Sequence, residues 1–222
     1  MNKKPTDEAP EYGSCPLCAE NRISLFFKDN TREYLLCRQC ALIFVPSEYQ
    51  LSAGEEKARY DLHQNNSEDE GYRSFLSRLS IPLLERLPPR QSGLDFGCGP
   101  GPVLSMMLEE EGHSMTLFDP YYRNNPEVLN RCYDFITATE VLEHLSAPGF
   151  ELGRLLGMLR PGGYLGIMTK MATDLEAFSL WHYIQDDTHI SFFSRQTFEY
   201  LAELHKVSLE FIENDVILMR KP

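Results

Sequence analysis

From residue 92 onward, short apolar runs alternate with amphipathic stretches along the chain. The apolar runs predict strands at residues 93–96, 115–118, 133–137 and 164–169. Apolar residues at helical spacing predict helices at residues 103–111, 150–159 and 194–205, and the closing pattern predicts an antiparallel hairpin of residues 207–212 and 216–219. Strands that alternate with helices indicate an α/β fold, with a mostly parallel sheet covered by helices on both faces.

The segment before this alternation is more polar and acidic, and it predicts a helix over residues 72–84 that Pro82 kinks or interrupts. We therefore expect three parts: a small N-terminal unit at residues 1–46, a helical connector or lid at residues 47–91, and an α/β domain at residues 92–222. Three residues of the connector are candidates either for a lid over a ligand or for ordinary packing: Tyr60, His63 and Tyr72.

Four of the six cysteines form two Cys-x-x-Cys pairs, Cys15 with Cys18 and Cys37 with Cys40. This spacing is typical of a zinc ribbon, in which four thiolates bind one structural Zn²⁺ ion. The residues between and after the pairs predict strands at 23–27, 34–36 and 41–45. A catalytic zinc ion would need an open coordination position, which four thiolates fill, and the remaining alternative is a pair of free dithiols.

The chain has 222 residues, of which 21 are Lys or Arg and 33 are Asp or Glu, so its formal net charge is −12. This charge repels polyanions and no basic cluster offsets it, so a nucleic-acid partner is disfavoured. No apolar run approaches the roughly 20 residues that cross a bilayer, and the N-terminus lacks the apolar stretch of a secretory signal. We expect a cytoplasmic protein without a membrane partner, and the sequence leaves its oligomeric state open.

The first predicted strand leads into a glycine-rich loop followed by a helix, in which Gly97, Gly99 and Gly101 let a ligand approach the backbone. Pro102 stands where a dinucleotide fingerprint has its last glycine. Asp95 suits an ammonium group better than a pyrophosphate, and Asp119, which ends the second strand, can accept both hydroxyls of a ribose. A nucleoside joined to an amino acid satisfies both acids.

Four segments resemble, in order, the motifs of class I S-adenosylmethionine-dependent methyltransferases: residues 93–101, 118–119, 135–144 and 159–163. The likeness is to the small-molecule group that includes quinone-biosynthesis O-methyltransferases, and some methyltransferases also carry an N-terminal zinc ribbon. The resemblance implies a Rossmann-like sheet and methyl transfer from S-adenosylmethionine to a small-molecule acceptor. It also implies cofactor-binding roles for Asp95 at the amino group, Gly97, Cys98, Gly99 and Gly101 at the methionyl part, Asp119 at the ribose, and Thr139 and Glu140 beside the sulfonium.

The chain departs from this family between its second and third strands. Residues 120–132 are too few for the helix, the strand and the adenine-binding acid that family members usually have there. We expect a minimal connection and carry over no adenine-binding acid. Phe118 or Tyr121 is the expected packing partner of the base.

Candidate catalytic residues lie in residues 177–193, which should hang over the carboxyl end of the sheet. His189 is the first candidate for a general base and His182 the second, in an aromatic pocket suited to a phenol or another flat acceptor. The alternative for His189 is an anchoring hydrogen bond to the backbone, and for Glu143 and His144 a role in packing or in starting a helix. Two other functions remain open: an RNA or protein methyltransferase that uses the zinc ribbon for recognition, and a non-catalytic S-adenosylmethionine-binding module.

Overall fold

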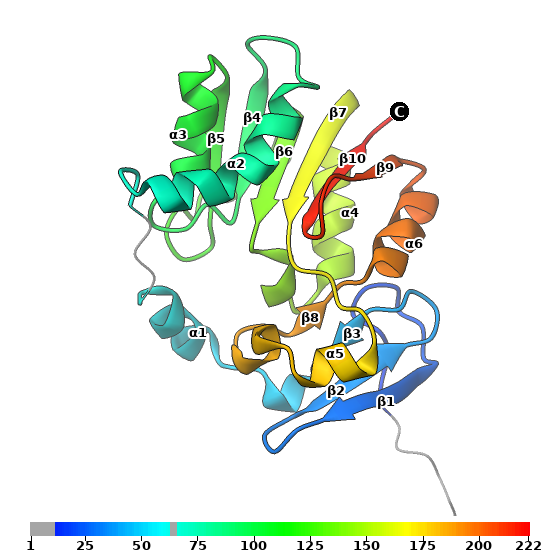
Figure 1. Ribbon diagram of the computed structural model, residues 1–222. Helices are drawn as coiled ribbons and strands as arrows, with labels where there is room; N and C mark the ends of the chain where they lie inside the picture. Colours follow the sequence, from blue (N-terminus) through cyan, green and yellow to red (C-terminus); the bar gives the residue numbers. More distant parts are fainter. Residues whose placement is uncertain (1–11, 63–65) are drawn as a thin grey trace, which may run out of the picture.

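Two β-sheets, one of six strands and one of four, organise the chain in the computed structural model, which describes residues 12–62 and 66–222. The six-stranded sheet and its helices form the upper part of the molecule in Figure 1, and the four-stranded sheet lies below it. Residues 1–11 and the predicted lid residue His63 fall outside the described residues.

The six-stranded sheet has the strand order β5-β4-β6-β7-β10-β9. Its strands are β4 (Ser92–Phe96), β5 (Ser114–Phe118), β6 (Tyr133–Thr139), β7 (Leu159–Met168), β9 (Ser208–Phe211) and β10 (Val216–Arg220). The first four pair with one another in parallel, whereas β10 runs antiparallel to both β7 and β9. The predicted fold class, a mostly parallel Rossmann-like sheet with a C-terminal antiparallel hairpin, is confirmed.

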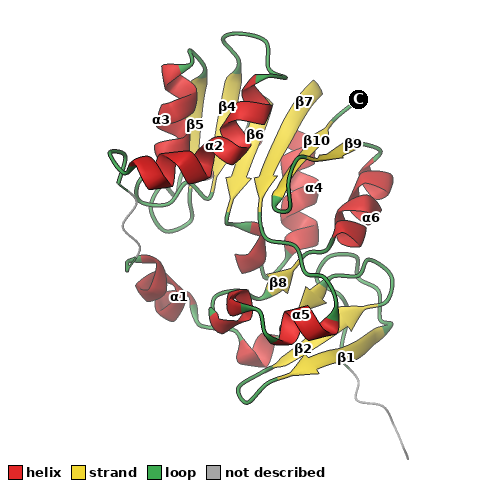
Figure 2. Cartoon of the chain, in the orientation of Figure 1, coloured by secondary structure: helices red, strands yellow, loops and turns green. Residues whose placement is uncertain are grey.

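Helices cover both faces of this sheet, as Figure 2 shows. They are α2 (Glu70–Leu84), α3 (Val103–Glu110), α4 (Pro148–Met158) and α6 (Arg195–His205). Because side chains alternate across a strand, Val216 and Leu218 of β10 pack in one core with α2 and α3, while Ile217 and Met219 pack in another with α4 and α6. The sheet is thus buried on both sides, as parallel sheets generally are.

Capping residues and backbone conformation determine where several helices and strands begin or end. The Ser194 hydroxyl begins α6 by accepting a hydrogen bond from the Thr197 amide at 3.2 Å, and the Thr197 hydroxyl in turn accepts one from the Ser194 amide. Pro82 does not interrupt α2, which continues to Leu84. β7 begins at Leu159, earlier than predicted, because Leu159 is already extended and pairs with Tyr133 before a register shift.

The link between β5 and β6 holds one 3₁₀ helix, η2 (Pro126–Asn130), and no further strand. The predicted minimal connection is confirmed, and β5 is consequently the edge strand of the sheet. The remaining short elements are η1 (Ser47–Tyr49), α1 (Ala53–Tyr60), η3 (Leu142–His144), α5 (Leu175–Ser179) and η4 (His182–Gln185). Within the described ranges, no helix is long and apolar enough to span a membrane.

The four-stranded sheet has the order β1-β2-β3-β8, with β1 (Ile23–Lys28), β2 (Glu33–Cys37), β3 (Ile43–Phe44) and β8 (Ser191–Phe192). Its last strand comes from far along the chain: Ile43 of β3 pairs with Phe192 of β8. The predicted strand at 41–45 shortens to two residues because Ala41, at φ 57°, still belongs to the turn after Cys40. The three domain boundaries stay predictions.

Arg32, between β1 and β2, joins this small sheet to the segment that carries the predicted catalytic histidines. Its buried guanidinium donates to the carbonyl oxygens of Ile184 at 2.7 Å, Asp186 at 2.9 Å and Asp187 at 3.3 Å. Its Nε also donates to the Tyr34 hydroxyl at 2.8 Å. One side chain of the N-terminal sheet therefore fixes the backbone of the loop that leads to His189.

Candidate functional site

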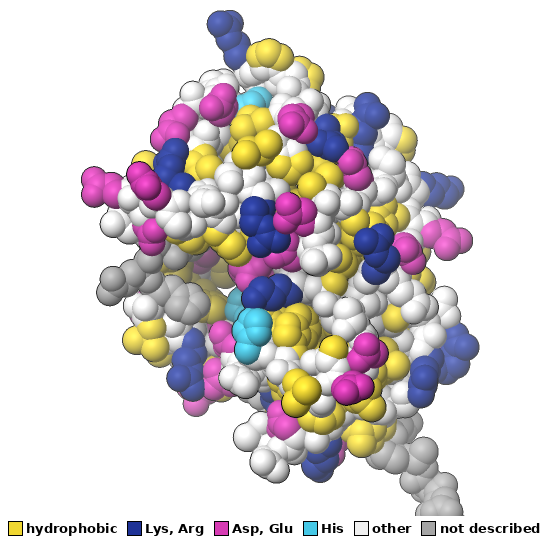
Figure 3. Space-filling model, viewed as in Figure 1, with side chains coloured by type: hydrophobic (Ala, Val, Ile, Leu, Met, Phe, Trp, Pro, Cys, Tyr) yellow, Lys and Arg dark blue, Asp and Glu magenta, His cyan; other side chains and the backbone are white. Residues whose placement is uncertain are grey.

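A cavity of about 930 Å³ opens at the carboxyl ends of β4, β5 and β6, where it is also lined by α1 and by the segment around η4. Figure 3 shows histidine side chains beside acidic and basic ones at this hollow. Six carboxylates line it: Glu56, Asp95, Asp119, Glu140, Glu151 and Asp186. Only Arg154 and Lys170 contribute cationic side chains among its described lining residues, so the cavity favours a ligand that carries positive charge.

The glycine-rich loop forms one wall of the cavity. Gly97 and Gly99 have φ values of 78° and 64°, which are left-handed conformations that glycine adopts without strain. A Cβ atom on Gly97 would also lie 2.4 Å from a methyl carbon of Val141. The predicted lining residues Gly97, Cys98, Gly99 and Gly101 all border the cavity, just before α3 begins.

Asp119 holds this loop and the β5 end together. One of its carboxylate oxygens accepts hydrogen bonds from the Tyr121 and Tyr122 amides at 2.8 and 3.0 Å, and the other accepts one from the Gly99 amide at 3.0 Å. A carboxylate oxygen has two lone pairs, so the oxygen bound to Gly99 keeps one acceptor position toward the cavity. The ribose contact of Asp119 stays a prediction.

Asp95 lies deeper. Its two oxygens accept hydrogen bonds from the Ser105 and Thr137 hydroxyls, each at 2.9 Å. Burial raises the pKa of Asp95 to about 6, although both hydrogen bonds act in the opposite direction. The predicted contact with an ammonium group stays a prediction, and an approaching cation would lower this pKa again.

Thr139 and Glu140, where β6 ends, present polar atoms that the protein does not satisfy. The Thr139 hydroxyl and one carboxylate oxygen of Glu140 are buried, and neither has a hydrogen-bond partner among the described residues. Glu140 adopts a left-handed φ of 52°, uncommon for a residue with a side chain. Burial, and secondarily the nearby Glu143 charge, raise the pKa of Glu140 to about 8. Buried polar atoms of this kind at a cavity wall call for a ligand.

His189, the first candidate base, lies in the cavity wall with 8% of its surface exposed. Its Nδ1 lies 2.8 Å from the Tyr183 carbonyl oxygen, which can only accept, so Nδ1 carries the proton and Nε2 holds the lone pair. Burial lowers the pKa of His189 and thus favours this neutral ring. His189 can therefore anchor the loop through Nδ1 and still offer Nε2 as a base.

His182, the second candidate, is exposed at the mouth of the cavity. Its Nε2 atom lies 2.9 Å from the Lys170 ammonium group, which donates to it. A lone pair engaged by an ammonium group is less available to accept a substrate proton. His182 and Lys170 together place one positive charge at the entrance.

The connector helix α1 contributes Glu56 and Tyr60 to the lining of the cavity. Glu56 of α1 accepts hydrogen bonds from the Tyr60 hydroxyl at 2.5 Å and from the Tyr121 hydroxyl at 2.6 Å. The Tyr122 hydroxyl donates to Asp61 at 2.7 Å. Tyr60 and Tyr72 both line the cavity, as the lid hypothesis for this segment requires.

Comparisons with known proteins are consistent with this architecture. A family model described as a methyltransferase domain matches residues 64–205. The chain belongs to this methyltransferase family. Its fold is also that of an S-adenosylmethionine-dependent methyltransferase from Archaeoglobus fulgidus, which is 18% identical over 76% of this chain and 98% of that chain, with a TM-score of 0.52.

A second solved structure is less similar in its overall superposition. It is the 1,6-didemethyltoxoflavin-N1-methyltransferase of Burkholderia thailandensis with bound 1,6-didemethyltoxoflavin and S-adenosylhomocysteine, 17% identical over 88% of this chain and 97% of that chain, with a TM-score of 0.47. A search of curated proteins finds no match to this methyltransferase. The sequence-based prediction of a methyltransferase is confirmed at the level of the family.

Two residues that the sequence interpretation assigned to packing lie at this methyltransferase cavity: His144 lines it, and Glu143 is buried behind its wall residue Tyr183. Glu143, fully buried, accepts hydrogen bonds from the Thr169 hydroxyl at 2.9 Å and from the Tyr183 hydroxyl at 2.5 Å. His144 lines the cavity, and its ring centre lies 4.8 Å from that of His189. The available signal was the spacing of Glu140, Glu143 and His144, which places three ionisable residues around one turn after a strand.

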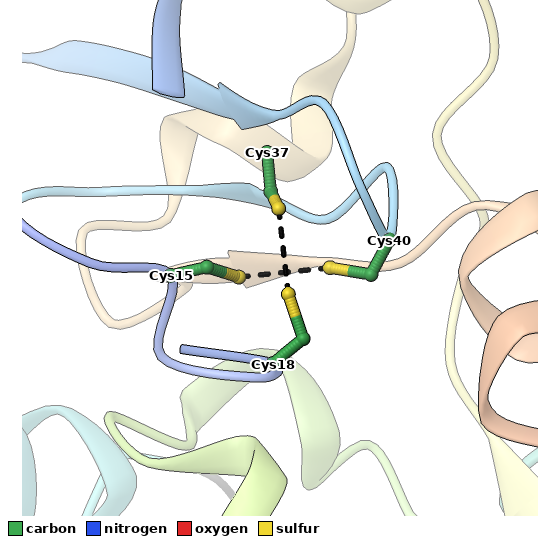
Figure 4. Close-up of side chains that lie close together, drawn as sticks. All are labelled: Cys15, Cys18, Cys37 and Cys40. Carbon is green, nitrogen blue, oxygen red and sulfur yellow. Dashed lines mark hydrogen bonds between the residues drawn. The ribbon is translucent and has the colours of Figure 1, made fainter. Parts of the chain in front are cut away.

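The four cysteines of the N-terminal pairs converge, as Figure 4 shows. The Sγ atoms of Cys15 and Cys40 are 3.6 Å apart and those of Cys18 and Cys37 are 3.5 Å apart, and all four lie within 4.8 Å of one another. Four thiolates at the Zn–S distance of about 2.3 Å in a tetrahedron have sulfur atoms about 3.8 Å apart. The cluster therefore has nearly the size that one Zn²⁺ ion requires.

Proposed function

We propose that the protein transfers a methyl group from S-adenosylmethionine to a small-molecule acceptor within the cavity. The observation that carries this proposal is the pair of unsatisfied buried atoms on Thr139 and Glu140, beside the glycine loop and Asp119. Bound S-adenosylmethionine supplies an electrophilic methyl group on a positively charged sulfur. The cavity's excess of carboxylates favours that charge, and its volume lies near the upper end of the roughly 300–1,000 Å³ of ligand sites, which leaves room for an acceptor.

Each predicted cofactor-binding residue has a position that fits its role. The methionyl part of S-adenosylmethionine would be lined by Gly97, Cys98, Gly99 and Gly101. Asp119 would accept hydrogen bonds from the ribose hydroxyls, and Asp95 would attract the amino group. Thr139 and Glu140 would meet the region of the sulfonium. Of the two predicted packing partners of adenine, Tyr121 is the better candidate, because Phe118 is buried and stacked on Phe96 with ring centres 5.5 Å apart whereas Tyr121 is only partly buried.

The acceptor would occupy the part of the cavity bordered by His144, Tyr183 and His189. Aromatic rings on this side support a flat acceptor, such as the phenols of the quinone-biosynthesis group that the sequence resembles. His189 would activate the acceptor, since its Nε2 lone pair is oriented away from the anchoring bond at Nδ1. A net charge of −12 and the six carboxylates of the cavity favour a small molecule over RNA.

Calorimetry with S-adenosylhomocysteine tests the cofactor site. We expect one binding site per chain and at least tenfold weaker binding by Asp119→Asn, because the amide would turn a donor toward the Gly99 amide or the ribose. Asp134→Asn is the matched control, since Asp134 lies on β6 but bonds Ser92 and Arg160 at the other end of the strand. Absence of binding by the unaltered protein, or equal binding by both variants, refutes the proposal.

The nature of the acceptor calls for a second measurement. Incubating the protein with radiolabelled S-adenosylmethionine and a cell extract should place the label in molecules that pass a filter retaining protein and RNA. Label confined to the retained fraction would contradict the small-molecule assignment.

We also propose that Cys15, Cys18, Cys37 and Cys40 bind one structural Zn²⁺ ion. The cluster's dimensions support this, as does its burial: three of the four cysteines are buried, and thiolates held so close together need a cation between them. Metal analysis of the unaltered protein should find zinc. The Cys18→Ser variant should lose this zinc, and its four-stranded sheet should lose its native fold. Zinc retained by that variant, or no metal in the unaltered protein, contradicts this proposal.

A further inference from the structure

The two basic side chains that line the cavity differ in what they bind. The guanidinium group of Arg154 pairs with the Glu151 carboxylate on the same helix. The ammonium group of Lys170 forms no ion pair with any described residue, and its one hydrogen bond there goes to Nε2 of His182 at 2.9 Å. Among the described lining residues, Lys170 is therefore the cation that lacks a carboxylate partner.

Lys170 and His182 together offer only N–H donors at the mouth of the cavity. An ammonium group has three such donors, and one of them is used on His182. Because an ammonium group only donates, Nε2 of His182 accepts, so Nδ1 carries the proton of this ring and is a further donor. Neither side chain makes another hydrogen bond within the described ranges. A positively charged set of N–H donors without an acceptor suits an anionic oxygen group, such as a carboxylate or a phosphate.

The backbone on both sides of this pair is well anchored. Lys170 lies between Thr169, whose amide donates to the turn between β9 and β10 at 2.9 Å, and Ala172, whose amide donates to the backbone after β8 at 2.7 Å. His182 begins η4, whose backbone accepts a hydrogen bond from the buried Arg32. Donors on a fixed backbone bind a charged group at a smaller entropic cost than donors on a mobile loop.

The Tyr183 ring connects this pair of donors to the candidate base. The Lys170 ammonium group lies 5.5 Å from the centre of the Tyr183 ring, and the centre of the His189 ring lies 4.0 Å from it. All of these side chains line the cavity. A flat acceptor that packs along Tyr183 therefore reaches His189 with one end and Lys170 with the other.

We propose that the methyl acceptor carries an anionic group, which Lys170 and His182 bind at the cavity mouth while another group of the same molecule receives the methyl group beside His189. This inference rests on the proposed function and narrows its substrate class to acidic, flat molecules. The net charge of −12 repels anions from the protein as a whole, so the unpaired charge of Lys170 also draws the acceptor to this entrance. A neutral analogue of the acceptor loses the charge-assisted hydrogen bonds and binds more weakly.

Benzoate and its uncharged analogue benzamide test this pair of donors, and phenyl phosphate is the alternative anion. Trp181 directly precedes His182 and packs on Tyr183 with ring centres 4.8 Å apart, so its fluorescence follows each titration of the intact chain. We expect one of the two anions to bind at least tenfold more tightly than benzamide, and the tighter one shows whether the group is a carboxylate or a phosphate. Lys170→Gln should weaken the binding of that anion at least tenfold and leave benzamide binding unchanged.

The matched control is Lys28→Gln, which removes an exposed lysine that pairs with Glu33 and does not line the cavity. Equal binding of benzamide and both anions, or equal anion binding by the two variants, overturns the proposal. Calorimetry with S-adenosylhomocysteine separates a second role: a lysine that only balances the nearby charge of Glu140 would change cofactor binding and not the preference for anions. We expect Lys170→Gln to bind S-adenosylhomocysteine as the unaltered protein does. Failure of the unaltered protein to bind S-adenosylhomocysteine would refute the proposed function, while the anion titration would still stand.

Discussion

Replacing Arg32 by alanine removes the side chain through which the N-terminal sheet holds the loop that carries the predicted catalytic histidines. The guanidinium makes three hydrogen bonds to the carbonyl oxygens of Ile184, Asp186 and Asp187, and one to Tyr34. A hydrogen bond that involves a charged group contributes about 1.5–3 kcal/mol, and bonds made by one residue are not additive. Since part of the exposed backbone regains water, we expect Arg32→Ala to lower the free energy of unfolding by about 3 kcal/mol.

The single tryptophan provides a local probe of this loss. Trp181 packs on Tyr183 with ring centres 4.8 Å apart, so its fluorescence reports on the loop that Arg32 holds. In urea, with a slope of about 2 kcal/mol per molar, a loss of about 3 kcal/mol moves the midpoint down by about 1.5 M. Circular dichroism of the same samples reports the whole fold.

Two variants calibrate the result. Arg32→Lys keeps the charge but loses the planar fork, so we expect it to recover only part of the stability. Arg22→Ala removes an exposed arginine of the same sheet that pairs with Glu20, and should change the free energy of unfolding by less than about 0.5 kcal/mol. If Arg32→Ala unfolds at the same urea concentration as Arg22→Ala, Arg32 does not hold the loop.

Two further changes test the cofactor end of the cavity. Asp95 has a pKa raised to about 6 from 3.8, so its contribution to stability is fully present below pH 3.8 and is lost as the pH rises through 6. In urea unfolding, Asp95→Asn should therefore show a smaller decline in stability between pH 4 and 7 than the unaltered protein, while the decline caused by the raised pKa of Glu140 remains in both. Parallel curves would contradict this. Gly97→Ala places a methyl group 2.4 Å from Val141 at a left-handed φ, and should lower the melting temperature and weaken S-adenosylhomocysteine binding more than tenfold in calorimetry. Gly157→Ala on α4 is the control, because no atom lies within 4 Å of the added Cβ. It should leave S-adenosylhomocysteine binding unchanged and the melting temperature unchanged or slightly higher. Equal effects of the two substitutions would refute the steric role of Gly97.

The sequence was informative where local chemistry decides the structure. Apolar spacing predicted β4, α3 and α6 to within a residue or two, and Ser194 predicted the start of α6, because caps and periodicity act over a few residues. The Cys-x-x-Cys pairs likewise predicted a cluster from spacing alone.

Contacts between distant residues could not be foreseen in this way. β8 is only two residues long and exists because Ile43 offers it a partner, so no local pattern marks it. Arg32 sits in a polar turn and would be taken for a surface residue, yet the three carbonyl oxygens that it binds lie more than 150 positions away. Glu143 acquires its surroundings from Thr169, Tyr183 and His189, which only the folded chain assembles.

The pairing of β3 with β8 bears on how this protein can be recombined or trimmed. A deletion of residues 1–46 would remove the strand that pairs with Ser191 and Phe192, which directly follow the loop that carries His189. The buried side chain of Phe192 would then be exposed to water. Chimeras that exchange the cysteine-bearing segment with another protein would have to bring a matching edge strand with it. Through the pairing of β3 with β8, loss of the proposed Zn²⁺ ion would change the geometry of the histidine loop. The supply of zinc and the proposed methyl transfer would then be coupled.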